Sequence, residues 1–211
     1  MTLTSEPKAP TPDVPMILGN ERKWTDYFTF CTDHKVIGIQ YLVTAFFFYL
    51  VGGALATAMR TELATPAPDI VTPDVYNGLL TLHGTIMLFL WIVPAGAGLA
   101  NYLIPLMIGA RDMAFPRLNA IAFWMIPPSG ILLIISFFLE PPAAGWTSYP
   151  PLSLTTGMIG EGIWIMSILV GGTASILGGL NFLVTILKMR VPLCRPGLAG
   201  ALILLALDLF A

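Results

Sequence analysis

Four long stretches of the chain contain no Asp, Glu, Lys or Arg. They cover residues 36–59, 75–110, 118–139 and 162–187. About 20 apolar residues in a helix cross the roughly 30 Å of hydrocarbon in a bilayer. A segment in lipid that is not part of a closed β-barrel pairs its backbone N–H and C=O groups only as a helix. The pattern therefore predicts an all-α fold, a polytopic bundle of four full transmembrane spans.

The second stretch is too long for one straight crossing at about 1.5 Å per residue. We expect its helix at about 77–105, bent at Pro94, with the remainder as loop. A fifth apolar run, residues 197–207, would rise only about 16 Å. Residues 192–211 are therefore interpreted as a loop and an incomplete fifth helix.

The basic residues indicate how the bundle is oriented. With four alternating crossings, only Arg60 falls on one side, and nine basic residues share the other: Lys8, Arg22, Lys23, Lys35, Arg111, Arg117, Lys188, Arg190 and Arg195. The excess of positive charge predicts that this second side, with the N-terminus, is cytoplasmic. Residues 1–19 are expected to form a disordered cytoplasmic tail, 20–35 an interfacial segment and 36–191 the four-helix unit.

Composition narrows the class of protein. The chain is 56% hydrophobic and 10% charged, with ten Lys+Arg against twelve Asp+Glu. So little charge excludes a soluble enzyme, and the absence of a basic face excludes a nucleic-acid binder. Cys31 and Cys194 both fall on the predicted cytoplasmic side, so we expect free thiols.

His83 is the sharpest candidate for chemistry, because polar groups inside a membrane are costly and are functional candidates by default. A neutral imidazole is a good iron or copper ligand, and the adjacent Gly84 would let a flat macrocycle approach the backbone. A histidine that hydrogen-bonds between helices would occupy the same position. Position alone does not decide between these two interpretations.

The only other histidine, His34, is expected roughly 25–30 Å away along the bundle axis. The two imidazoles therefore cannot share a metal, and a six-coordinate haem on His83 would need its second ligand from outside this sequence. We interpret His34 as an interfacial cap beside Asp33 and Lys35.

A second polar group is predicted at the cytoplasmic end. Asp112 lies in the loop after the second helix, and four polar residues on four helices share the inner third of the bundle: Tyr41, Asn101, Asn119 and Asn181. A carboxylate collects protons, and amides and hydroxyls hold water, as a proton-uptake pathway requires. Hydrogen bonds between helices are the alternative for each asparagine.

The outer loops carry fewer signals. Arg60 is either an interfacial anchor paired with Glu62 or a donor to a cofactor oxygen at the depth of His83. We expect Glu140 and Glu161 to be solvated boundary charges. The aromatic loop 145–153 suits a belt at the lipid headgroups or a lid on a cofactor.

Five segments resemble subunit I of the haem–copper oxidases, closest to bacterial cytochrome c oxidases of the haem A type. They are 33–38 (DHKVIG), 82–87 (LHGTIM), 101–110 (NYLIPLMIGA), 111–119 (RDMAFPRLN) and 145–151 (GWTSYPP), and the resemblance covers about residues 24–191 in the family's order. It implies that His83 is the axial ligand of a low-spin haem A and that Arg60 hydrogen-bonds the formyl group of that haem. Trp146 and Tyr149 would lie near its propionates.

The resemblance also implies a proton route. Asp112 matches the entrance carboxylate of the D-pathway, and the residues along it match Asn101, Asn119, Asn181 and Tyr41. Two hydroxyl-bearing positions of that pathway are Ala122 and Ala174 in this chain. After Val191 the sequence departs from the family, and the helices that carry the copper ligands and the remaining haem ligands are absent. We expect the oxygen-reducing centre, with its haem and copper, only in the complete subunit.

The implied function is that of part of the catalytic subunit of a terminal respiratory oxidase, in a bacterial plasma membrane or an internal energy-transducing membrane. The complete enzyme would oxidise cytochrome c through subunit II, reduce oxygen to water and pump protons, in a complex that includes subunit III. A quinol donor is not distinguished from cytochrome c. A truncated, inactive homologue and a non-redox permease or structural subunit are the alternatives.

Overall fold

The computed structural model describes residues 24–64, 66, 70–191 and 200, and the ordered elements within them are all helical. Four helical spans are long and apolar enough to cross a membrane, which confirms the predicted all-α, four-span bundle. The predictions for residues 1–19 and 192–211 concern residues outside the described part of the chain, apart from Gly200. The elements are η1 (Trp24–Phe28), α1 (His34–Glu62), α2 (Pro73–Thr85), η2 (Ile86–Ile92), α3 (Val93–Ile108), α4 (Pro116–Leu139), α5 (Leu152–Thr155) and α6 (Met158–Lys188).

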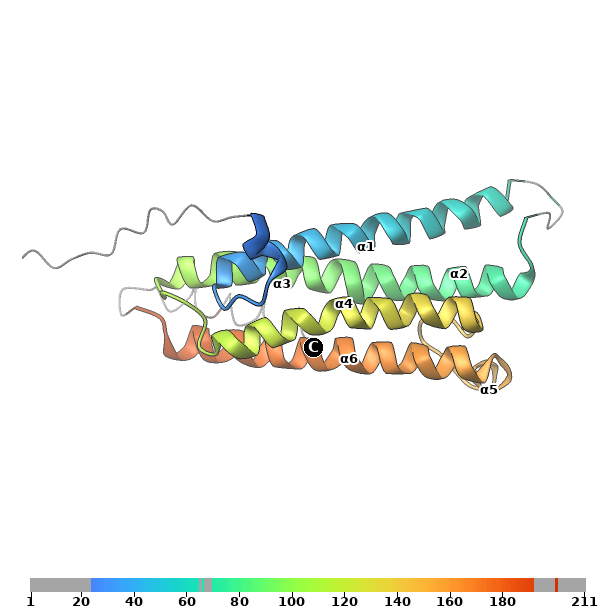
Figure 1. Ribbon diagram of the computed structural model, residues 1–211. Helices are drawn as coiled ribbons and strands as arrows, with labels where there is room; N and C mark the ends of the chain where they lie inside the picture. The colour runs from blue at the N-terminus through green and yellow to red at the C-terminus, as the bar shows by residue number, and fades with distance from the viewer. Residues whose placement is uncertain (1–23, 65, 67–69, 192–199, 201–211) are drawn as a thin grey trace, which may run out of the picture.

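The four long helical rods lie side by side, and each runs antiparallel to the one before it in the chain (Figure 1). α2, η2 and α3 together form the second rod, and α4 packs along α6. We call the end that holds the start of α1 and the end of α3 the inner end, and the end that holds the start of α2 the outer end. Side chains far from one another in the sequence therefore meet at each end.

The second span is longer than predicted, and the expected bounds 77–105 are wrong at both ends. Thr72 caps the helix start, its hydroxyl accepting from the Val75 amide, and Pro73 occupies the first turn, where no N–H is needed. Helix α3 stops at Gly109, whose φ of 73° is left-handed and suits glycine. The residues that cap these ends are uncharged, so the positions of charged residues did not predict where the helix begins and ends.

The irregularity expected at Pro94 takes the form of a π-helical segment. η2 occupies the turns immediately before this proline, and the Val93 amide donates to Leu88 O, five residues back. Proline lacks an N–H and crowds the carbonyl four residues earlier. The extra residue per turn accommodates the ring without ending the span.

Two glycines let α1 and α3 approach closely near the inner end. A Cβ on Gly38 would lie 2.9 Å from Gly98 O, and a Cβ on Gly98 would lie 2.9 Å from Gly38 O. Small residues at helix crossings are typical of membrane bundles. This contact brings the first turn of α1 beside the last turns of α3, where the polar groups of the inner end lie.

The segment before α1 folds back onto that helix. Gln40 is 4% exposed, and its Nε2 donates to Tyr27 O (3.0 Å) and Thr29 O (3.1 Å). Trp24 and Phe28 are 85% and 75% exposed. Aromatic side chains with a polar partner nearby suit the boundary between lipid and water, and the interfacial location of residues 20–35 stays a prediction.

Candidate functional site

His83 lies on α2 with one ring nitrogen bonded and the other without a partner among the described residues. Its Nδ1 donates to Gly52 O on α1 at 2.9 Å. Because a carbonyl accepts, this bond places the proton on Nδ1 and leaves the Nε2 lone pair available. The helix begins at Pro73 rather than at residue 77, so His83 lies about 15 Å along it.

Gly84 lies beneath the aromatic loop of the outer end. A Cβ on Gly84 would lie 3.0 Å from Trp146 Cδ1, and the rings of Trp146 and Phe89 are 6.5 Å apart between centroids. Trp146 and Tyr149 are 47% and 73% exposed. The indole therefore covers the glycine next to the histidine, and both aromatic rings are open on another side.

Hydrogen bonds fix this loop to α2 and α6. The Gly145 amide donates to Thr81 Oγ1 at 2.9 Å, and Thr81 is completely buried two residues before His83. Ser148, in the left-handed region at φ 48°, donates its hydroxyl to Glu161 Oε1. The loop is thus positioned from both sides, and Trp146 is positioned with it.

Of the two interpretations of Arg60, the structure does not support the ion pair with Glu62. Glu62 does not pair with Arg60: it is 7% exposed, and its Oε2 accepts from the backbone amides of Ile70 (3.1 Å) and Val71 (3.0 Å). Arg60 is exposed, with no hydrogen bond or ion pair to another described residue. The carboxylate of Glu62 is bonded to amides of the loop between α1 and α2, and it therefore does not pair with Arg60.

Glu161 is also not a solvated boundary charge, because it is 6% exposed and accepts from Ser148. Glu140 is half-buried, and its Oε2 accepts from the Ile159 amide at 3.1 Å. Both carboxylates bond to groups of the outer loops, which only the folded chain brings to them. A charge near the end of an apolar run therefore did not indicate solvent exposure here.

At the inner end, a chain of hydrogen bonds joins α1, α3 and α4. His34 is 3% exposed, and its Nδ1 donates to Asn101 O at 2.9 Å. Asn119 Nδ2 donates to Asn101 Oδ1 at 2.6 Å, and Asn101 Nδ2 donates to Ala97 O at 2.9 Å. The interfacial-cap interpretation of His34 is wrong: Asp33 caps the helix by accepting from the Lys35 amide, and His34 joins two helices.

Asp112 lies at the mouth of this network, half-buried, with Oδ1 accepting from the Met113 amide at 2.7 Å. Burial raises the pKa of its carboxyl above the ordinary value. The Met113 amide and the nearby His34 oppose that rise, and the charge of Asp33 adds to it. A carboxyl with a raised pKa holds a proton at pH values where a surface carboxylate is ionised.

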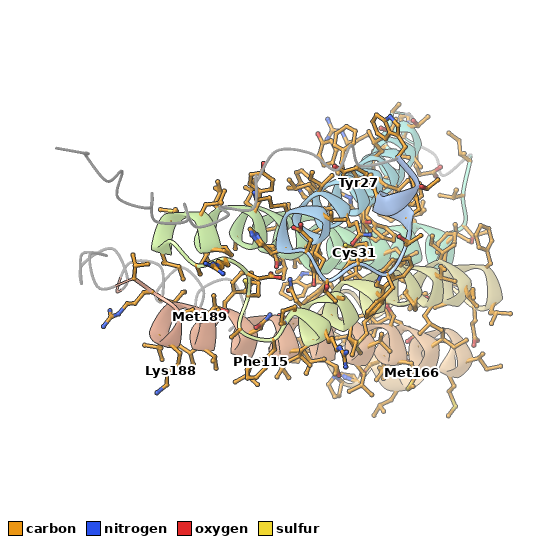
Figure 2. All side chains as sticks on the ribbon, turned by 60° about the vertical axis from the view of Figure 1, so that its left-hand side comes forward. Tyr27, Cys31, Phe115, Met166, Lys188 and Met189 are labelled. Carbon is orange, nitrogen blue, oxygen red and sulfur yellow. The ribbon has the colours of Figure 1, made fainter. Side chains whose placement is uncertain are left out.

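Asn181 lies at the same end but in a different arrangement from the other two asparagines. Its Oδ1 accepts from the Phe115 amide at 2.9 Å, and its Nδ2 donates to Phe115 O at 3.3 Å. Thr185 accepts from the Ala114 amide at 2.9 Å. Figure 2 shows Phe115 beside α6, near Lys188 and Met189. The side chains of Asn181 and Thr185 on α6 therefore hold the loop that carries Asp112.

A cavity of about 300 Å³ lies in the bundle among α1, α3, α4 and α6, and Tyr41 lines it. Ala97, whose carbonyl accepts from Asn101, lines it too, so the asparagine pair lies one turn from the cavity wall. Ala174 and Ser175 contribute from α6, whereas Ala122 is fully buried in α4. Sequence reasoning missed Ser175, although a hydroxyl inside an apolar span six residues before Asn181 was a usable signal.

Comparison with known proteins adds a family to this geometry. Residues 36–210 match the model of the family described as "Cytochrome C and Quinol oxidase polypeptide I". The chain is 64% identical to cytochrome c oxidase subunit 1 of Synechocystis sp. over 212 residues, which cover 90% of this chain and 38% of the relative. The corresponding protein of Thermostichus vulcanus is 64% identical over 174 residues, or 82% and 32%.

A more distant relative, the "Heme-copper oxidase subunit I+III" of Aeropyrum pernix, is 46% identical over 173 residues, which cover 80% of this chain and 21% of the relative. The chain thus spans between 21% and 38% of the length of these curated relatives. The family match covers the four spans except residues 34 and 35, and it includes His83, Asn101, Asp112 and Asn119. This multi-pass membrane chain therefore belongs to the subunit I family of the haem–copper oxidases, a family of multisubunit enzymes with haem and copper cofactors.

Proposed function

We propose that this chain is part of the catalytic subunit of a terminal respiratory oxidase and that His83 is the axial ligand of a low-spin haem A. The proposal rests on the bond from His83 Nδ1 to Gly52 O. Metal-bound histidines commonly donate their second ring nitrogen to a carbonyl, which fixes the tautomer and aims the free nitrogen at the metal. The donor set therefore fits a haem iron.

Three further residues of the outer end would help to hold the haem. Arg60 would donate to the formyl oxygen, because its guanidinium is exposed and free of Glu62. Trp146 and Tyr149 would lie near the propionates, on the loop that Thr81 and Glu161 hold. When bound, the haem supplies reversible one-electron oxidation and reduction. The protein supplies a ligand of fixed tautomer in a site covered by aromatic rings.

Asp112 would take up protons at the inner end. Its raised pKa favours capture of a proton. Asn101 and Asn119 follow, and Asn119 Oδ1 is buried without a partner, so it can accept from a water that carries the proton onward. Tyr41 and the cavity beside it would continue the route, and Asn181 would hold the entrance loop.

The activity of the whole enzyme is part of the same proposal. The curated relatives are named cytochrome c oxidase subunit 1, which favours cytochrome c as the donor, reached through subunit II. Oxygen would be reduced to water, with proton pumping, at a haem–copper centre in the complete subunit. The fused I+III relative supports an association with subunit III. The haem A type and the low-spin state rest on the resemblance to the haem–copper oxidase family, in which His83 and Arg60 match residues that hold this haem.

The decisive experiment is the visible spectrum of the purified oxidase complex with His83→Ala. The low-spin haem band should be lost completely, because no other histidine lies at that end of the described chain. His34→Gln is the matched control, since it changes the other histidine and should keep the band. An unchanged spectrum in His83→Ala would refute the assignment, and a wild-type complex without haem would favour a non-redox membrane subunit. Haem without oxygen consumption would favour an inactive homologue.

A further inference from the structure

Two threonines lie on the face of α2 opposite His83. Thr81 and Thr85 are two residues before and two residues after the histidine, and at 3.6 residues per turn each lies about 160° around the helix from it. Thr81 is 0% exposed and Thr85 is 1% exposed. Both threonines are therefore enclosed by the bundle, while His83 bonds on the other side of the helix to Gly52 O on α1.

Trp164 on α6 bonds to the second of these threonines. Its Nε1 donates to Thr85 Oγ1 at 3.0 Å, and that hydroxyl donates in turn to Thr81 O at 2.7 Å. Trp164 is 6% exposed, and a buried indole N–H is costly without an acceptor. In the described chain, no Cα atom of α6 lies within 8 Å of a Cα atom of α2. The long indole thus bridges two helices that do not pack directly.

The rotation of α2 about its axis is not set by the inner half of the second rod. The close contact of Gly38 with Gly98 fixes α3 against α1, but the seven residues of the π-helical segment η2 lie between α3 and α2. A π-helix has more residues per turn than an α-helix, so the α-helical register does not carry across it. The direction in which each face of α2 points therefore depends on the contacts that α2 makes itself.

Rotation of α2 would move the candidate ligand. A helix Cα lies about 2.3 Å from the axis, so a rotation of about 20° displaces the Cα of His83 by roughly 0.8 Å. Functional side chains have to be held to within about 0.5 Å. The bond from His83 to Gly52 O acts at one point, so α2 could turn about it. The bond from Trp164 to Thr85 acts on the opposite face and opposes this rotation.

We propose that Trp164 is a positioning residue for His83: by donating to Thr85 from α6, it fixes the rotation of α2 and hence the direction of His83 Nε2. Gly52 O and the indole N–H then hold α2 from two opposite sides. The inference rests on the proposed ligation of a haem iron by His83. It assigns to Trp164 a role that acts through the ligand and requires no contact between the indole and the haem.

Electron paramagnetic resonance of the oxidised oxidase complex tests this role, because the signal of a low-spin haem depends on the orientation of its imidazole ligand. Trp164→Phe keeps an aromatic ring but removes the N–H, so we expect a shifted and broadened low-spin signal at unchanged haem content. Trp124→Phe, the same change on α4 at a residue that is 37% exposed, should leave the wild-type signal. An unshifted signal in Trp164→Phe, or a lower haem content without a shift, would overturn the proposal.

Variants of Thr85 separate positioning from packing. Thr85→Val keeps the shape of the side chain without the acceptor and should reproduce the shift, whereas Thr85→Ser keeps the hydroxyl and should retain the wild-type signal. The double variant with Trp164→Phe and Thr85→Val should shift the signal no further, because both changes break the same bond. Additive shifts, or equal shifts in Thr85→Ser and Thr85→Val, would contradict the positioning role.

Hydrogen exchange gives a readout that does not depend on the haem. The backbone amides of residues 83–86 should exchange about five-fold faster in Trp164→Phe, as expected for one lost hydrogen bond between neutral groups. Unchanged exchange would count against the link between α2 and α6. The variant His83→Ala keeps the two proposals apart. A low-spin signal that survives this change refutes the haem assignment and the positioning role with it, whereas a signal that His83→Ala removes and Trp164→Phe leaves unshifted refutes the positioning role alone.

Discussion

The two ends of the bundle treat their polar groups in opposite ways. At the outer end, His83 bonds through one nitrogen to Gly52 and keeps the other free, beneath an aromatic loop. At the inner end, His34 is buried, and Asn101 and Asn119 bond to each other across helices. The two histidines of the chain therefore have different surroundings, although both lie on apolar helices.

We infer from this difference that a polar group within a span indicates function by the atoms that it leaves without a partner. His34 Nδ1 joins two helices, and the amide of Asn181 is occupied by Phe115. His83 Nε2 and Asn119 Oδ1 lack partners among the described residues. Interhelical bonds build the scaffold at both ends, and the free atoms are where ligand or water is expected to bind.

The largest effect that separates the ends is expected from Asp112→Asn. Loss of the titratable carboxyl should slow proton uptake roughly 100-fold, because an amide cannot capture a proton, while the haem band of the outer end stays unchanged. Uptake is followed with a pH dye in the reconstituted complex. Asp74→Asn, an exposed change at the outer end, is the control. Equal uptake by the wild type and the Asp112 variant would remove Asp112 from the pathway.

Gly38→Ala should loosen the inner end alone. The new Cβ would lie 2.9 Å from Gly98 O and 3.2 Å from Tyr102 Cβ, and overpacking of this kind lowers the free energy of unfolding by about 1–3 kcal/mol. Gly53→Ala on the same helix meets nothing within 4 Å and should be neutral. Unfolding midpoints in detergent compare the two. Equal midpoints would show that the helices can separate without cost at this crossing.

Thr81→Val should loosen the outer loop by a smaller amount. The change keeps the shape of the side chain but leaves the Gly145 amide without its acceptor, at a cost of about 1 kcal/mol. Hydrogen exchange at the Gly145 amide should become about five-fold faster. Thr57→Val, whose hydroxyl bonds only within α1 on an exposed face, is the control. Unchanged exchange at Gly145 would mean that Glu161 alone holds the loop.

The smallest effect is expected from Asp33→Asn. The charge of Asp33 contributes to the raised pKa of Asp112, behind burial as the main cause. Asparagine caps a helix as well as aspartate does, so α1 should stay intact while the pKa of Asp112 falls. At a given pH above the ordinary carboxyl range, less of Asp112 is then protonated, and the uptake profile moves to lower pH. An infrared titration of the carboxyl stretch measures this pKa, and an upward shift would contradict the sign.

The four spans were predictable because the lack of charged residues in a stretch is a property of the sequence. It does not depend on how the helices pack. Their ends were harder, since Thr72 and Gly109 act through backbone geometry that a count of charges does not register. The sequence also indicated the depth of Asn101 and Asn119, because position along a helix follows from residue number. The sequence did not indicate that the two asparagines bond to each other, because that depends on which faces of α3 and α4 are turned toward each other.

The sequence by itself determined the four membrane spans, and it identified His83 and Asp112 as costly polar groups near opposite ends. Only the tertiary structure decided the partner of each group: Gly52 for His83, Asn101 for His34, the 70–71 backbone for Glu62 and Ser148 for Glu161. The physical reason is that hydropathy is local in the sequence, whereas these hydrogen bonds join segments that are distant in the sequence. Hydropathy is summed along one helix, whereas a hydrogen bond requires two atoms within about 3 Å, and chain segments far apart in sequence meet that condition only after the helices have packed.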